Sequence, residues 1–157
     1  MPARDARKSA PALRLERFVP YRLAILSNLV SGAIARNYQA RFGIAIPEWR
    51  VMAVLGLGDA LSGNQVAART EMDKVQVSRA VRRLLQLGYI SRAFAREDRR
   101  RSRLALSRKG RRVYADVVPF ALATERTLLE ALSDEEQSQL DTLLGKLSAR
   151  ATNLSAP

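Results

Sequence analysis

Apolar residues recur every three or four positions along most of the chain, which is the spacing that predicts amphipathic helices. The first run covers residues 17–41 and ends before Gly43, so it predicts one long helix. Three shorter helices follow. Pro47 suits the first turn of one, and Ser62 and Asp73 are N-cap residues of the others, each with a glutamine three positions later. The last of the three ends at Gly88.

Two later segments alternate polar and apolar residues, as half-buried strands do. They cover residues 89–95 and 102–107, and the charged residues between them predict a hairpin loop. A long helix then begins at Ser107 and runs to about Leu132, with a bend expected at Pro119. The sequence SDEE at 133–136 caps a final helix. The pattern predicts a mainly helical fold with one small β-hairpin.

Composition limits the chemistry that the chain can perform. The 157 residues are 47% hydrophobic, which predicts one compact domain, and they include no cysteine and no histidine. Thiol chemistry, imidazole-dependent triads and ordinary zinc sites are therefore not expected, and no cofactor is predicted. No apolar run reaches the roughly 18 residues of a membrane helix, so a cytoplasmic protein is expected. Residues 1–14 predict a disordered basic tail, with a transit peptide as the alternative.

The positive charge is concentrated in one quarter of the chain. The net charge is +12, and residues 74–112 contain fourteen lysines and arginines against two acids, while the remaining residues balance at thirteen against thirteen. Such a focused field attracts a polyanion, and nucleic acid is the commonest one. A membrane surface is the competing polyanion, but it requires exposed apolar anchors opposite the basic face. Double-stranded DNA is the expected partner, and no membrane is.

The helix that follows Asp73 has one apolar and one basic face. On a helical wheel Val77, Ala80, Val81, Leu84, Leu85 and Leu87 share one side, and Val75, Arg79, Arg82, Arg83 and Gln86 lie opposite. A solvated surface is the ordinary explanation of such a face. Here no acid lies on it, so intrahelical ion pairs are not its purpose. The face predicts a recognition helix for the major groove, with these candidate contacts: Lys74, Gln76, Ser78, Arg79, Arg82 and Arg83.

The order of these elements, with the sequences "IPEWRVMAVLG", "MDKVQVSRAVRRLLQLGYISR", "EDRRRSRLALSRKG" and "LSDEE", resembles the MarR family of bacterial transcriptional regulators. The resemblance covers about residues 17–150. It implies a winged helix-turn-helix homodimer that binds pseudo-palindromic DNA and usually represses transcription until a small effector releases it. In this interpretation residues 46–115 bind DNA, and residues 15–45 and 116–150 form the dimerisation helices.

The resemblance also explains the arginine-rich hairpin loop. Arg100 matches the family's minor-groove arginine, and a planar guanidinium suits a narrow groove of high negative potential. Asp98 is expected to orient Arg100 through a bidentate pair, although simple charge balance is the alternative. Arg99, Arg101 and Arg103 are candidate phosphate contacts or solvated residues.

Apolar stripes on the terminal helices exceed what a small winged domain can cover, which favours a dimer over packing within one chain. The stripes consist of Leu15, Phe18, Leu23, Leu26, Val30 and Ile34 at one end, and Leu128, Leu129, Leu132, Leu140, Leu143, Leu144 and Leu147 at the other. In the family the effector pocket lies between these helices and the winged domain. The candidate ligand residues there are Arg22, Asn28, Trp49 and Arg50, for an anionic ligand such as an aromatic carboxylate or its coenzyme A thioester. A core role is favoured for Trp49 over a place in the ligand wall, and the arginines could equally be surface or DNA-facing residues.

Three classes of function are compared. The leading one is a ligand-responsive repressor, with activation left open because the sign depends on where the operator lies. The second is a global or architectural DNA-binding protein without an effector. The third is an enzyme, which would require acids such as Glu48, Asp59 or Asp116 to converge, and no motif supports that. A non-enzymatic regulator is therefore predicted.

Overall fold

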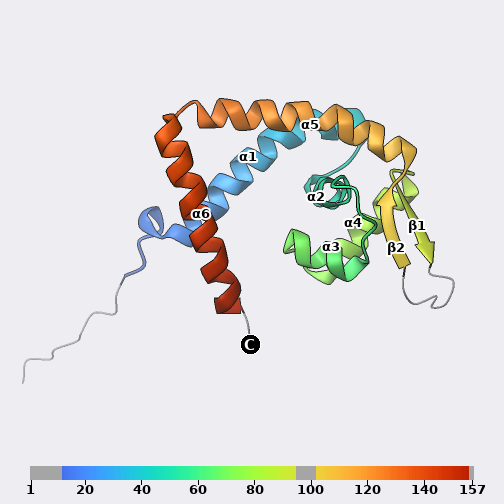
Figure 1. The fold of residues 1–157 in the computed structure, drawn as a ribbon, viewed down its shortest axis with the longest axis horizontal. Helices are drawn as coiled ribbons and strands as arrows, with labels where there is room; N and C mark the ends of the chain where they lie inside the picture. The colour runs from blue at the N-terminus through green and yellow to red at the C-terminus, as the bar shows by residue number, and fades with distance from the viewer. Residues whose placement is uncertain (1–11, 95–101, 156–157) are drawn as a thin grey trace, which may run out of the picture.

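The computed structural model describes residues 12–94 and 102–155, and it contains six α-helices and one two-stranded sheet in that part of the chain (Figure 1). The prediction of a mainly helical fold with a small hairpin is confirmed. A short 3₁₀ turn at Leu15–Arg17 precedes the first helix. The elements are α1 Val19–Phe42, α2 Ile46–Leu55, α3 Gly63–Thr70, α4 Lys74–Gln86, β1 Ile90–Phe94, β2 Ser102–Leu106, α5 Arg108–Leu129 and α6 Asp134–Ser155.

Local side-chain caps set most of the helix starts, as the sequence predicts. Ser62 and Gln65 form both hydrogen bonds of a capping box at α3. Asp73 caps α4 by accepting a hydrogen bond from the backbone N–H of Gln76 at 2.8 Å. Gly43 is the C-cap of α1, and its φ of +65° is the left-handed conformation that glycine adopts without strain. α5 continues unbroken through Pro119.

The two strands pair antiparallel, with Ile90 opposite Leu106 and Phe94 opposite Ser102. An isolated bridge between Leu61 and Leu104 adds a third short segment to this small sheet. β2 buries Leu104 and Leu106, but β1 buries only Ile90, and Phe94 is 58% exposed. The half-buried alternation expected for the first strand is therefore wrong, because the outer half of the hairpin projects beyond the core.

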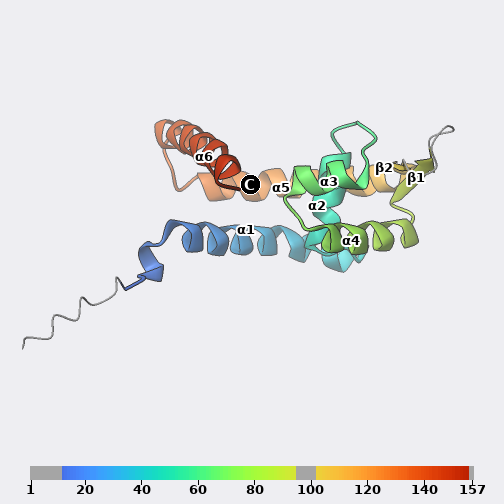
Figure 2. The same cartoon turned by 90° about the horizontal axis from the view of Figure 1, so that it is seen from below.

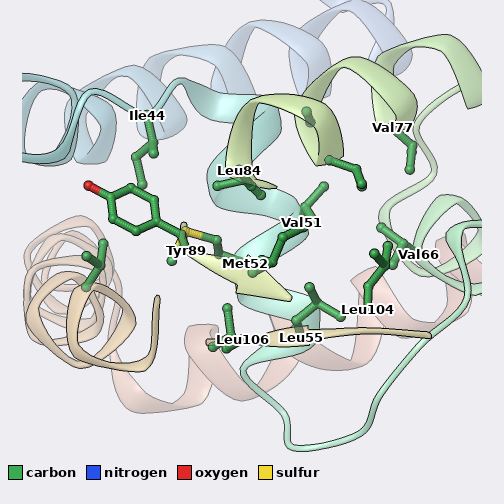
Figure 3. Close-up of a cluster of buried hydrophobic side chains, with 14 of the residues drawn as sticks. Ile44, Val51, Met52, Leu55, Val66, Val77, Leu84, Tyr89, Leu104 and Leu106 are labelled. Carbon is green, nitrogen blue, oxygen red and sulfur yellow. The ribbon is translucent and has the colours of Figure 1, made fainter. Parts of the chain in front are cut away.

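The core is centred on α2, whose Val51, Met52 and Leu55 are surrounded by side chains of the neighbouring elements (Figure 3). α3 contributes Val66 and α4 contributes Leu84, among others. Every buried residue in the described part of the chain lies between Ala35 and Val117. We call residues 35–117 the head, and the first half of α1, the second half of α5 and all of α6 the arms.

The arms extend away from the head, and α6 turns back from the far end of α5 (Figures 1 and 2). Their apolar side chains remain exposed in the single chain: Leu29 is 67% exposed and Leu143 is 55% exposed. Among the described helices none is long and apolar enough to cross a membrane.

Candidate nucleic-acid interface

α4 presents its basic face to solvent. Val77, Ala80, Val81 and Leu84 are buried, so the apolar side predicted by the helical wheel is confirmed. The six candidate contacts on the helix are all exposed: Lys74, Gln76, Ser78, Arg79, Arg82 and Arg83. Within the described residues no acidic side chain forms an ion pair with these cations. Their charge is therefore available to an external anion.

Hydrogen bonds from the start of α5 hold the C-terminal end of α4. Ser107 donates its side-chain O–H to the carbonyl of Gly88 at 2.6 Å and its backbone N–H to the carbonyl of Tyr89 at 3.0 Å. Lys109 Nζ donates to the carbonyl of Leu87 at 3.0 Å. A cation near the last carbonyls of a helix also interacts favourably with the helix dipole. α4 is thus fixed to α5 as well as to the core.

Tyr89 joins this junction to α1. Its hydroxyl donates a hydrogen bond to the carbonyl of Phe42, the last residue of α1, at 3.0 Å. Lys109 Nζ lies 4.9 Å from the centre of the Tyr89 ring, which is a cation–π distance. A single residue therefore connects the end of α1, the turn after α4 and the start of α5.

The two strands β1 and β2, which we call the wing, contribute further cations beside α4. Arg92 and Lys74 line one cavity of about 210 Å³ together with Ser78, Ser102 and Asn64, between α3, α4 and the two strands. Arg103 donates a hydrogen bond to the carbonyl of Ala60 at 2.9 Å, so it also ties the wing to the loop before α3. Arg92 was not identified from the sequence. It lies on a strand fourteen positions after Ser78, and the periodicity of a helix does not show which strand residue will lie beside it. Asp98, Arg99, Arg100 and Arg101 lie outside the described residues.

The four candidate effector residues occupy two separate places. Trp49 packs between Tyr38 of α1 and Tyr114 of α5, with ring centres 5.6 and 5.8 Å away. Arg50, the next residue in the sequence, is exposed. Arg22 and Asn28 lie towards the other end of α1, and sixteen helical residues between Arg22 and Tyr38 span about 24 Å. Within one chain, Arg22 is therefore remote from the aromatic stack.

Tyr38 is buried within this stack, and its burial affects its ionisation. Burial raises the pKa of Tyr38 to about 12, although the nearby charge of Arg50 opposes the shift.

Two of the acids considered for catalysis have structural contacts elsewhere: Glu48 accepts a hydrogen bond from the backbone N–H of Ala45 at 2.6 Å, and Asp116 lies 4.0 Å from Arg41. Asp59 is exposed in the loop between α2 and α3.

Three short helices, the last with a basic outer face, followed by a two-stranded wing, define a winged helix-turn-helix protein. The sequence model of the MarR family matches residues 42–101. The HTH-type transcriptional regulator BilQ of Clostridium symbiosum (strain WAL-14163) is 30% identical over 105 residues, which cover 67% of this chain and 73% of BilQ. The chain belongs to the MarR family, as its sequence motifs predict.

Solved structures share the fold. A MarR/EmrR family transcriptional regulator from Acinetobacter sp. ADP1 superposes with a TM-score of 0.81 at 29% identity, over 90% of this chain and 99% of that one. MepR of S. aureus, solved as a complex with DNA, superposes with a TM-score of 0.77 at 22% identity, over 85% of this chain and 98% of MepR. At that identity the likeness to MepR shows the fold alone.

Proposed function

We propose that this protein is a cytoplasmic transcriptional regulator that binds a pseudo-palindromic DNA operator as a homodimer and represses transcription. The observation that carries the proposal is the exposed face of α4, which bears Lys74, Arg79, Arg82 and Arg83 and no acid. Cations that have no acidic partner among the described residues keep their attraction for phosphate and for the acceptor-rich edge of guanine. Membership of a family of transcriptional regulators supports the same function.

Within this proposal the residues of α4 divide between bases and backbone. Arg79 lies near the middle of the exposed face and is assigned to a guanine, where a guanidinium can form two hydrogen bonds. Gln76 is assigned to an adenine for the same geometric reason. Lys74 and Ser78 line the cavity beside the wing, where a backbone phosphate would meet Arg92 as well. Arg82 and Arg83 are assigned to phosphates further along the helix.

The decisive experiment is a binding titration with the chain's own upstream region and a neighbouring divergent promoter. If two subunits neutralise about six to ten phosphates, log affinity should fall with log salt at a slope of about −0.9 per phosphate. Arg79→Ala should cost about 1 to 3 kcal/mol of binding free energy and relax sequence preference. Arg150→Ala, which removes the same charge from α6, is the matched control and should leave the preference intact. A salt slope near zero would remove DNA as the partner.

The exposed arms support the dimer. Two apolar grooves, of about 760 and 540 Å³, lie on the arms and are lined by residues of the predicted stripes, including Leu26, Leu140 and Leu143. Contiguous apolar surface of this kind marks an interface in soluble proteins. Light scattering should give twice the chain mass for the wild type and a smaller mass for Leu143→Lys. Leu57→Lys, at a residue 73% exposed on the head, should remain dimeric. A monomeric wild type would contradict this part of the proposal.

The proposal includes a small anionic aromatic effector acting where the arms join the head. Tyr38, Trp49 and Tyr114 already stack there, and Arg50 is an exposed cation beside them. Thermal stabilisation by an aromatic carboxylate, together with release of DNA, is the expected result. A protein that binds DNA but is stabilised by no anionic metabolite would instead be the global or architectural regulator that the sequence leaves as the alternative.

A further inference from the structure

One apolar side chain is exposed on the basic face of α4. Val75, the second residue of the helix, is 59% exposed. Every other apolar residue of α4 is buried or half-buried: Val77, Ala80, Val81, Leu84 and Leu85. Val75 therefore takes no part in the packing that holds α4 in the head, and its position requires another explanation.

The local structure gives no reason for a valine there. A β-branched residue has a slightly lower helix propensity than alanine or an unbranched residue, and the first turn of a helix favours acidic side chains. The N-cap of α4 is already supplied by Asp73. Val75 lies one turn before Arg79 on the same stripe of the helix and is surrounded on the wheel by cations. The valine thus forms a small apolar patch inside a surface that otherwise suits a polyanion.

We propose that Val75 reads thymine, by packing its methyl groups against the C5-methyl of a thymine in the major groove. That methyl is the apolar group that base edges present in the groove, whereas the other groups on those edges are hydrogen-bond donors and acceptors. The N-terminal part of a recognition helix is the part that contacts base edges, and Val75 is in its first turn. The inference rests on the proposed DNA-binding function and adds a specificity-determining residue to it.

The geometry also predicts where that thymine lies. Val75 and Arg79 are four residues apart, which is about 6 Å along a helix axis. Successive base pairs are spaced by about 3.4 Å along the duplex. The thymine should therefore lie within about two base pairs of the position at which Arg79→Ala relaxes sequence preference.

The test uses the full chain and a duplex that the wild type selects from a random pool. Each thymine of that duplex is replaced in turn by deoxyuridine, which removes only the C5-methyl. At the thymine read by Val75 the wild type should lose about four-fold in affinity, the equivalent of burying one CH₂ group. Val75→Ala should bind the thymine duplex with a similar loss of affinity. Its affinity should not change further when that thymine is replaced by deoxyuridine. Val75→Ile keeps the apolar contact and should retain the sensitivity.

Gln86→Ala is the matched control, because residue 86 is exposed on the same stripe three turns later. It should keep the deoxyuridine sensitivity of the wild type. The inference is overturned if no thymine methyl affects wild-type affinity, or if the sensitivity at every position persists in Val75→Ala. Failure of the proposed function looks different: no duplex would be selected, and binding would show no steep dependence on salt.

Discussion

Gly110→Ala should destabilise the head by breaking the junction between α4 and α5. Gly110 is buried in the first turn of α5, and a Cβ atom there would overlap the carbonyl oxygen of Tyr89 and lie 2.7 Å from the carbonyl carbon. Both atoms belong to the backbone, so no side-chain rotation can relieve the overlap. α5 would have to move away from the turn that follows α4.

The size of the effect follows from the hydrogen bonds that cross this junction. Ser107 forms two of them and Lys109 forms one. At about 1 kcal/mol each, their loss would cost about 3 kcal/mol. Alanine is favoured over glycine inside a helix by about 1 kcal/mol, which opposes the loss. A net destabilisation of about 2 kcal/mol is therefore expected.

Urea denaturation at one fixed protein concentration measures this change. Trp49, the single tryptophan, is packed in the head and provides the fluorescence signal. With an m-value of about 2 kcal/mol per molar urea, the midpoint of Gly110→Ala should fall by about 1 M. Gly63→Ala is the control, because a Cβ there meets no atom within 4 Å, and its midpoint should stay the same or rise slightly. Equal midpoints for Gly110→Ala and the wild type would refute the close approach of α5 to Tyr89.

Four further predictions concern other parts of the chain. Gly56→Ala should lower the thermal midpoint, because its Cβ would overlap the ring of Tyr114 and displace it from the aromatic stack, which near-ultraviolet circular dichroism would detect. The free energy of unfolding should fall as the pH rises from 10 towards 12, since the raised pKa of Tyr38 favours the neutral phenol in the folded state, and Tyr38→Phe should reduce that fall. Arg100→Ala should weaken DNA binding and Arg100→Lys should restore only part of it. Asp98→Ala should also weaken binding, with a coupling energy to Arg100 of about 0.5 to 3 kcal/mol in a double-mutant cycle, whereas tighter binding would leave Asp98 as charge balance.

The features that sequence predicts well here depend on neighbours within one or two turns. The caps at Ser62 and Asp73 join residues three positions apart, and the buried face of α4 follows from its helical period. The exposed basic face of α4 could be predicted for the same reason. Its residues Arg79 and Arg82 are identified by position on a wheel, without knowledge of the rest of the fold.

The features that escaped prediction depend on contacts between distant segments. Tyr89 bonds to Phe42, forty-seven residues earlier, and the Leu61–Leu104 bridge joins the wing to a loop before α3. Polar and apolar alternation in β1 was no guide to burial, because Phe94 extends past the core that would have covered it. Periodicity reports which residues share a face, but only the packing of other elements decides whether that face is covered.

All buried residues in the described part of the chain lie in the head, so the head and the arms can diversify separately. Under the proposed dimer, the choice of partner chain is encoded in the arms and the choice of DNA sequence in α4 and the wing. The two specificities can therefore change separately, since a substitution such as one at Leu143 alters no contact of the head core. Exchanging the arms between two related chains should redirect which copies pair while each head keeps its own operator. A cell containing several such regulators could keep them from mixing by divergence of the arms alone.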